Sequence, residues 1–172
     1  MHKTKKEDKL IVGMELSFPP FEMRDTNGNP KGISVDLAHS LGEYLGKEVE
    51  IKHIAWNGLI TSLQTKKIDL ITSSMAIIEA RKEKVDFSDP YAHTVIAALV
   101  YRDSPVKKSS DLNHPERTLA LRQGTTSYFF ALDQFPESKK NSFATETPAI
   151  TEVIQGKANA FLYDWLSVYK LY

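Results

Sequence analysis

The stretch Ile68-Asp69-Leu70-Ile71-Thr72-Ser73-Ser74-Met75 decides the fold class, because its short apolar run is typical of a strand buried in a sheet. Two further strand patterns, at residues 10–12 and 49–52, precede it, and apolar residues recur at helical spacing within 37–45 and 59–63. Strands that alternate with helices in this way predict a parallel sheet with right-handed crossovers. We therefore expect an α/β fold.

The rhythm changes after a long apolar strand at residues 95–101. Arg102-Asp103-Ser104-Pro105 interrupts the pattern, and a second strand–helix set follows, with strands expected at 118–121 and 160–163. The sequence therefore predicts two small lobes. The expected parts are a polar tail at 1–8, lobe 1 at 9–100, a hinge crossover at 101–104 and lobe 2 at 105–172.

Composition narrows the class of function. The 172 residues carry 22 basic and 22 acidic side chains, so nothing favours a nucleic-acid partner, whose binders usually carry a basic excess. The chain has no cysteine, which excludes disulfides, thiolate metal sites and cysteine nucleophiles. We expect neither a metal nor a cofactor, because no metal-ligand spacing links His2, His39, His53, His93 and His114.

The first ten residues are polar and lack the apolar centre of a signal peptide, so we expect any export signal to have been removed. No apolar run in the sequence approaches the roughly 18 residues that cross a bilayer. The one basic cluster, which we interpret as a solvated tail, consists of Lys3, Lys5 and Lys6.

Ligands of open α/β sheets bind beyond the carboxyl ends of the strands. This rule selects the segment that begins at Glu15, the segment from Ser73 to Arg81, the segment Gly124-Thr125-Thr126, and Asp164. The guanidinium of Arg81 offers a planar fork that suits a carboxylate. A surface ion pair with Glu79 or Glu83 is the alternative interpretation.

The other selected residues offer complementary groups. Gly124-Thr125-Thr126 begins a helix whose N–H groups suit an anion, although a plain helix cap is an equal alternative. Asp164 suits an ammonium, or it caps the helix expected from Trp165. Phe18 and Trp56 are candidates for pocket walls, whereas we expect Phe21 in the core. An anion clamp, a cation acceptor and aromatic walls without reaction machinery favour a binder of zwitterions.

Several motifs, in order along the chain, resemble those of the polar amino-acid periplasmic binding proteins, solute-binding protein family 3, which serve ABC importers. The opening segment is Val12-Gly13 followed by Pro19-Pro20-Phe21-Glu22. The most specific block is Ser74-Met75, Arg81 and Val85-Asp86-Phe87-Ser88-Asp89-Pro90-Tyr91. The resemblance implies a two-lobed fold of the type II periplasmic-binding-protein kind, with each lobe a mostly parallel sheet flanked by helices.

The resemblance also implies roles for individual residues. Arg81 would hold the ligand α-carboxylate, together with the backbone N–H groups of Ile78 and Thr126. Asp164 and the carbonyl of Ser74 would take the α-ammonium. The side-chain pocket would be formed by Phe18, Trp56 and, near its far end, Glu15.

Two positions depart from the family pattern. Ala76 and Ile78 stand where hydroxyl residues are usual, so two hydrogen bonds to charged ligand groups are lost. Each such bond contributes roughly 1.5–3 kcal/mol. Either the affinity is lower, or other groups substitute, or the ligand is not a standard α-amino acid.

The resemblance implies the substrate-binding component of an ABC-type amino-acid importer, either periplasmic or lipid-anchored at the cell surface. It would bind a polar amino acid between the lobes, close on it and deliver it to a membrane permease. Glu15 and the aromatic residues favour a cationic ligand such as arginine, lysine or histidine. We expect a binder and not an enzyme, but two alternatives stay open: a cyclohexadienyl-dehydratase-like enzyme with Glu15 as general acid, and the ligand-sensing module of a larger receptor.

In the family, the chain returns from the second lobe to complete the first, whereas this sequence stops at Tyr172. We therefore expect a C-terminally incomplete fold. The apolar faces that such a fold exposes would favour domain swapping or association.

Overall fold

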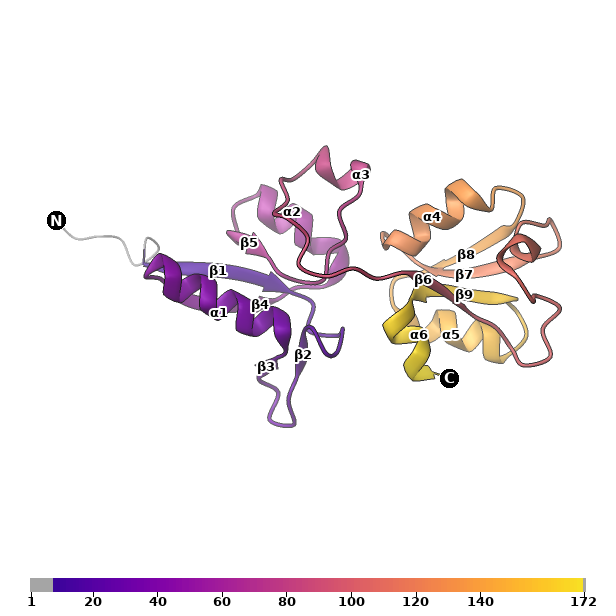
Figure 1. Cartoon of the computed structure of the whole chain (residues 1–172), viewed down its shortest axis with the longest axis horizontal. Coiled ribbons are helices and arrows are strands. Elements are labelled where there is room, and N and C mark those ends of the chain that lie inside the picture. Colours follow the sequence, from indigo (N-terminus) through magenta and orange to yellow (C-terminus); the bar gives the residue numbers. More distant parts are fainter. Residues whose placement is uncertain (1–7, 172) are drawn as a thin grey trace. The chain divides into compact units, whose positions relative to one another are not determined.

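The computed structural model describes residues 8–171, so the predicted tail with Lys3, Lys5 and Lys6 lies outside the described residues, apart from Asp8. The chain forms two compact units, of which the first ends at Asp89 and the second begins at Pro90 (Figure 1). Each unit has its own sheet and its own helices. We describe each unit by itself.

The first unit is built on a three-stranded parallel sheet in the order β4-β1-β5, as the alternation of strands and helices predicts. In the central strand, Val12 pairs with Ile51 on one side and Leu70 on the other. The elements are β1 (Lys9–Met14), β2 (Met23–Arg24), β3 (Pro30–Lys31), α1 (Ile33–Leu45), β4 (Glu48–His53), the 3₁₀ turn η1 (Trp56–Gly58), α2 (Leu59–Gln64), β5 (Leu70–Ile71) and α3 (Glu79–Lys82).

Helix α1 packs closely on the sheet through small residues. Its buried residues are Ser34, Val35, Ala38 and Gly42. A Cβ atom at Gly42 would lie 2.2 Å from Cγ2 of Val49, so the helix approaches β4 too closely for a side chain there. Leu37 and Tyr44, which belong to the apolar pattern that predicts this helix, are instead 41% and 87% exposed. The helix is confirmed, but its buried face is not the one with the largest apolar residues.

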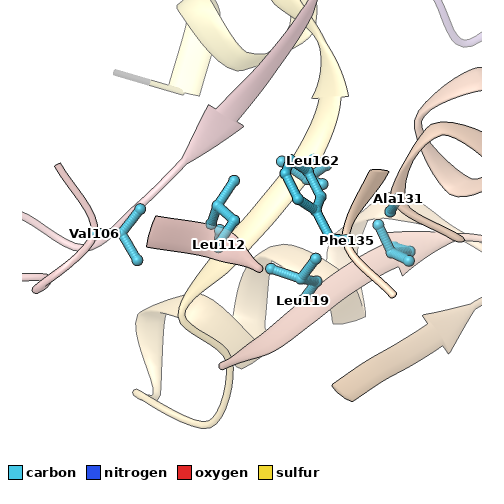
Figure 2. Close-up of a cluster of buried hydrophobic side chains, with 8 residues drawn as sticks. Val106, Leu112, Leu119, Ala131, Phe135 and Leu162 are labelled. Carbon is cyan, nitrogen blue, oxygen red and sulfur yellow. The ribbon is translucent and has the colours of Figure 1, made fainter. Parts of the chain in front are cut away.

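The second unit has a four-stranded sheet in the order β6-β9-β7-β8, in which β6 runs antiparallel to β9 and the other pairs are parallel. Its elements are β6 (Ile96–Leu99), the 3₁₀ turn η2 (Ser109–Leu112), β7 (Thr118–Arg122), α4 (Thr126–Gln134), β8 (Lys139–Phe143), α5 (Glu146–Ile154), β9 (Ala160–Asp164) and α6 (Trp165–Leu171). Figure 2 shows the core between sheet and helices, where Leu119 and Leu162 meet Ala131 and Phe135.

The division between the units lies before β6, whereas the sequence places the change of lobe after it, at residues 101–104. The reason is the pairing of β6 with β9, in which Ile96 lies opposite Asp164 and Leu99 lies opposite Phe161. An apolar strand at residues 96–99 fits either sheet by its pattern alone. The partner strand assigns it to the second unit.

We predict that Gly32→Ala destabilises the protein far more than Gly28→Ala. Both glycines have positive φ, 126° and 85°, and such backbone conformations cost a residue with a side chain about 1–3 kcal/mol. Only at Gly32 would the new Cβ also clash, at 2.3 Å from the carbonyl oxygen of Phe21, whereas nothing lies within 4 Å at Gly28. Urea unfolding should give a loss of about 3 kcal/mol or more for Gly32→Ala. Equal losses for the two variants would show that the backbone at Phe21 gives way.

Candidate functional site

The loops that follow β1, β4 and β5 meet at the carboxyl edge of the first unit's sheet. Glu15, directly after β1, donates its backbone N–H to Oγ of Ser73 at 2.9 Å. The Glu15 carboxylate accepts the backbone N–H of Trp56 at Oε1, over 3.2 Å. Ser73 follows β5 and Trp56 follows β4, so Glu15 joins all three loops. The structure thus brings two predicted site residues, Glu15 and Trp56, into contact.

Arg81 lies in the same cluster. Its Cζ atom is 5.2 Å from the ring centroid of Trp56, which is a cation–π contact, and Nη1 donates to the carbonyl of Ala76 at 2.7 Å. Arg81 is only 4% exposed, so it is not the surface residue that the alternative interpretation assumes. Glu79, one of its two suggested surface partners, pairs with Lys82 at 2.8 Å.

Ile78 precedes the short helix α3 and holds its first turn. The Ile78 carbonyl accepts the backbone N–H of Arg81 at 3.0 Å and that of Lys82 at 3.1 Å. Ile78 itself has an extended backbone, with φ −137° and ψ 153°. The segment from Ala76 to Arg81 is therefore fixed at both ends, by the Arg81 side chain and by the helix that carries it.

Two residues that follow strands of this sheet adopt the left-handed backbone conformation. Leu16, after β1, has φ 58°, and Ser74, after β5, has φ 51°. This conformation is rare for residues other than glycine, and such strain gathers at functional sites. It therefore supports the choice of this edge of the sheet as the candidate site.

A buried carboxylate lies beside the cluster. Glu22 is 1% exposed, and its Oε2 accepts the hydroxyl of Ser34 at 2.6 Å and that of Ser74 at 2.9 Å. Burial, and to a smaller extent the charge of Glu15, raise the pKa of Glu22 to about 7, against the two hydroxyls that lower it. Glu22 therefore changes its charge near neutral pH.

Phe18 lies on the turn that Glu22 closes. Phe18 and Glu22 exchange backbone hydrogen bonds, of 2.7 Å from the N–H of Phe18 and 3.0 Å from the N–H of Glu22. The ring of Phe18 stacks on that of Phe21, with centroids 5.9 Å apart and planes at 22°. Phe21, which we expect in the core, is only partly buried, and its ring packs against that of the candidate wall residue Phe18.

The second unit presents its two predicted residues at strand–helix junctions. Thr126 is the first residue of α4, and Thr125 caps that helix by accepting the N–H of Tyr128 at 3.3 Å. The cap interpretation thus holds for Thr125, while the N–H groups of the first turn lack carbonyl partners within the helix. Asp164 ends β9 directly before α6 and is partly buried.

A buried polar group lies behind these junctions. Nη1 of Arg122 contacts Oε1 of Glu146 at 3.1 Å and donates to the hydroxyl of Tyr163 at 3.1 Å. Burial, together with the charge of Glu146, raises the pKa of Tyr163 well above its usual range. The group joins β7, α5 and β9, and thereby fixes the strand that ends at Asp164.

Most residues of this cluster were predicted from the sequence, but the buried polar residues beside them were not. Glu15, Trp56, Ala76 and Arg81 are brought together by contacts within the first unit, and Ser74 directly follows Ser73, whose hydroxyl accepts the Glu15 N–H. Glu22, Ser34, Arg122 and Glu146 were not predicted as site residues. Glu22 had one signal, its place at the end of the opening family motif.

Among residues 8–171, no helix has the length and apolar character that a membrane crossing needs. Within the same range, the histidine, aspartate and glutamate side chains do not gather in threes as they would around a metal ion.

Residues 10–161 match the family described as bacterial extracellular solute-binding proteins, family 3. The L-cystine-binding protein TcyJ of Escherichia coli is 36% identical over 114 residues, which cover 65% of this chain and 43% of that protein. The arginine-binding periplasmic protein of Mannheimia haemolytica is 30% identical over 154 residues, which cover 90% of this chain and 62% of that protein. The chain thus spans less than two thirds of the length of these curated relatives.

Among solved structures, the ancestral amino-acid-binding protein AncCDT-1, a precursor of cyclohexadienyl dehydratase, superposes with a TM-score of 0.87. It is 38% identical, and the match covers 96% of this chain and 75% of that one. This likeness, with the two α/β sheets, confirms the predicted fold class of two-lobed periplasmic binding proteins.

We predict that Glu22 makes the protein less stable as the pH rises from about 4.5 to 7. In that window the folded protein still holds the Glu22 proton, whereas the unfolded chain has lost it, so the free energy of unfolding falls with pH and levels off above 7. The full difference is about 3 kcal/mol. Urea unfolding at several pH values should show this fall in the parent and in Asp36→Asn, an exposed control on α1. The same fall in Glu22→Gln would assign it to another group.

Proposed function

Because the chain belongs to family 3 of the bacterial extracellular solute-binding proteins, we propose that it is the substrate-binding component of an ABC-type amino-acid importer. The names of its relatives, a cystine-binding and an arginine-binding protein, support an amino-acid ligand. The chain spans part of their length, so the proposal concerns the whole protein to which these two units belong.

The observation that carries the proposal is the cluster of Glu15, Trp56 and Arg81 at one edge of the first unit's sheet. A zwitterion needs a cation for its carboxylate and an anion for its ammonium. Arg81 would bind the α-carboxylate through its planar fork, helped by N–H groups at Ile78 and Thr126. Asp164 and the carbonyl of Ser74 would accept the α-ammonium.

Within this class, we propose a ligand with a cationic side chain. Trp56 and Phe18 offer flat faces for an aliphatic stem or a cation, and the Glu15 carboxylate lies in contact with Trp56. Ala76 and Ile78 carry no hydroxyl, so backbone groups would replace the side-chain hydrogen bonds that the family pattern provides. The arginine-binding relative from Mannheimia haemolytica supports this choice of ligand.

The proposed place of action is outside the cytoplasm, either in the periplasm or at a lipid-anchored position on the cell surface. The family description and the periplasmic relative support an extracytoplasmic site. The proposed partner is the membrane permease of the importer, which would receive the amino acid. Family membership is what supports both the extracytoplasmic location and the permease partner.

An enzyme remains the second candidate, because AncCDT-1 is described as a precursor of cyclohexadienyl dehydratase. That protein is itself described as amino-acid-binding, which supports a binder. Glu15 would be the general acid of such an enzyme. Incubation with prephenate and arogenate tests it directly, and formation of an aromatic product would replace the binding proposal.

We predict that L-arginine, L-lysine or L-histidine raises the melting temperature of the folded protein. A ligand at 100 times its dissociation constant adds about 2.7 kcal/mol to the free energy of unfolding. A thermal-shift screen against the common amino acids checks this, with circular dichroism to establish folding. No shift with any of them would reject the proposed function, and a shift only with neutral amino acids would reject the cationic ligand.

We predict that Arg81→Lys weakens amino-acid binding about 10- to 100-fold, because lysine keeps the charge but loses the two-pronged hydrogen bond. Arg24→Lys is the matched control, since Arg24 lies exposed on the β2–β3 ribbon and bonds the carbonyl of Gly28. Isothermal titration of both variants with the best ligand of the screen measures the change. Equal affinity of Arg81→Lys and the parent would remove Arg81 from the carboxylate site.

A further inference from the structure

Glu22 joins three segments of the first unit that are far apart in the sequence. Through its backbone it closes the turn with Phe18, by hydrogen bonds of 2.7 and 3.0 Å. Through one carboxylate oxygen it holds Ser34 on α1 and Ser74 after β5.

The turn that contains Glu22 is also fixed to the start of α1. The carbonyl of Pro20 accepts the N–H of Ile33 at 3.3 Å, and the carbonyl of Phe21 accepts the N–H of Ser34 at 2.8 Å. The helix start therefore uses backbone carbonyls of the turn as partners, and Gly32 allows this close approach. Because Phe18 lies on this turn, the position of its ring depends on the hydrogen bonds that Glu22 makes.

Ser74 needs such an external partner. Its left-handed backbone, with φ 51°, costs about 1–2 kcal/mol for a residue other than glycine. The hydrogen bond from its hydroxyl to Glu22, at 2.9 Å, offsets that cost and fixes where the chain leaves β5. The segment toward Ala76 and Arg81 starts from this point.

We propose that Glu22 is a positioning residue for the ligand, because it fixes the aromatic wall at Phe18 and the ammonium-accepting backbone at Ser74 relative to each other. This inference rests on the proposed function. Glu22 acts through these two residues and is not itself assigned a ligand contact.

Because Glu22 changes its charge near pH 7, its positioning role should make ligand affinity depend on pH. An ionised carboxylate only accepts hydrogen bonds, so one oxygen takes both serine hydroxyls, whereas the protonated acid must also place its own proton. Glu15 is the charged group that acts on Glu22, from the loop after β1, while α1 and the segment after β5 present the hydroxyls of Ser34 and Ser74. Because the pKa of Glu22 is about 7, the ionised arrangement forms between pH 6 and 8.

The experiment measures L-arginine affinity from pH 6 to 8 for the parent chain, Glu22→Gln and the exposed control Asp36→Asn. We expect the parent and the control to bind more tightly as the pH rises. We expect Glu22→Gln to bind about tenfold more weakly at pH 8 and to lose the pH dependence, which a merely structural defect would not remove. Ser74→Ala, which removes one hydrogen bond, replaces Glu22→Gln if that variant does not fold.

A second measurement needs no ligand. Hydrogen exchange of peptides that cover residues 16–22 and 72–78 should be faster in Glu22→Gln than in the control. Unchanged exchange in both segments would overturn the inference, and so would parent-like affinity with a parent-like pH profile. Failure of the parent to bind any amino acid would instead reject the proposed function, while the exchange data still decide whether Glu22 holds the two segments.

Discussion

The first unit depends on the pairing of β1 with two parallel neighbours, β4 and β5. Parallel neighbours lie about 4.8 Å apart, so the loops that leave them at the same edge are within hydrogen-bonding reach. Glu15 therefore reaches Ser73 on one side and Trp56 on the other. The packing behind the strand is tight, since a Cβ at Gly13 would lie 2.5 Å from Cδ1 of Ile68. The cluster is a consequence of this arrangement and not of any single motif.

Each unit also buries a charged side chain beside its candidate residues, and the partners differ. Within residues 8–171, Glu22 accepts hydrogen bonds from two serine hydroxyls and forms no ion pair, and burial raises its pKa to about 7. Arg122 has the carboxylate of Glu146 and the hydroxyl of Tyr163. A buried charge costs several kcal/mol unless it is paired. The ion pair of Arg122 with Glu146 fixes the strands and the helix that it joins. The Glu22 carboxyl, in contrast, changes its charge near pH 7.

The predictable part of the candidate site consists of residues that follow strands. Arg81, Asp164 and Glu15 were predicted because the strand-end rule selects them and the family resemblance implies a role for each. Glu22, Ser34 and Arg122 were not predicted, although Glu22 ends the opening family motif and Arg122 ends β7, because the role of each polar side chain comes from its burial. Burial depends on partners 12, 24 or more residues away, such as Ser34 for Glu22 and Glu146 for Arg122. A local pattern does not contain that information.

The sequence by itself determined the α/β class and the alternation of strands and helices, because apolar periodicity is a local property. Tertiary structure decided the rest. It assigned β6 to the second unit, because an apolar strand takes its place from its partner, here β9. The structure also contains β8, whose residues Lys139–Phe143 are too polar for the sequence pattern to predict a strand. Finally, it turned the small residues of α1 inward, because only they allow close contact with Val49 on β4.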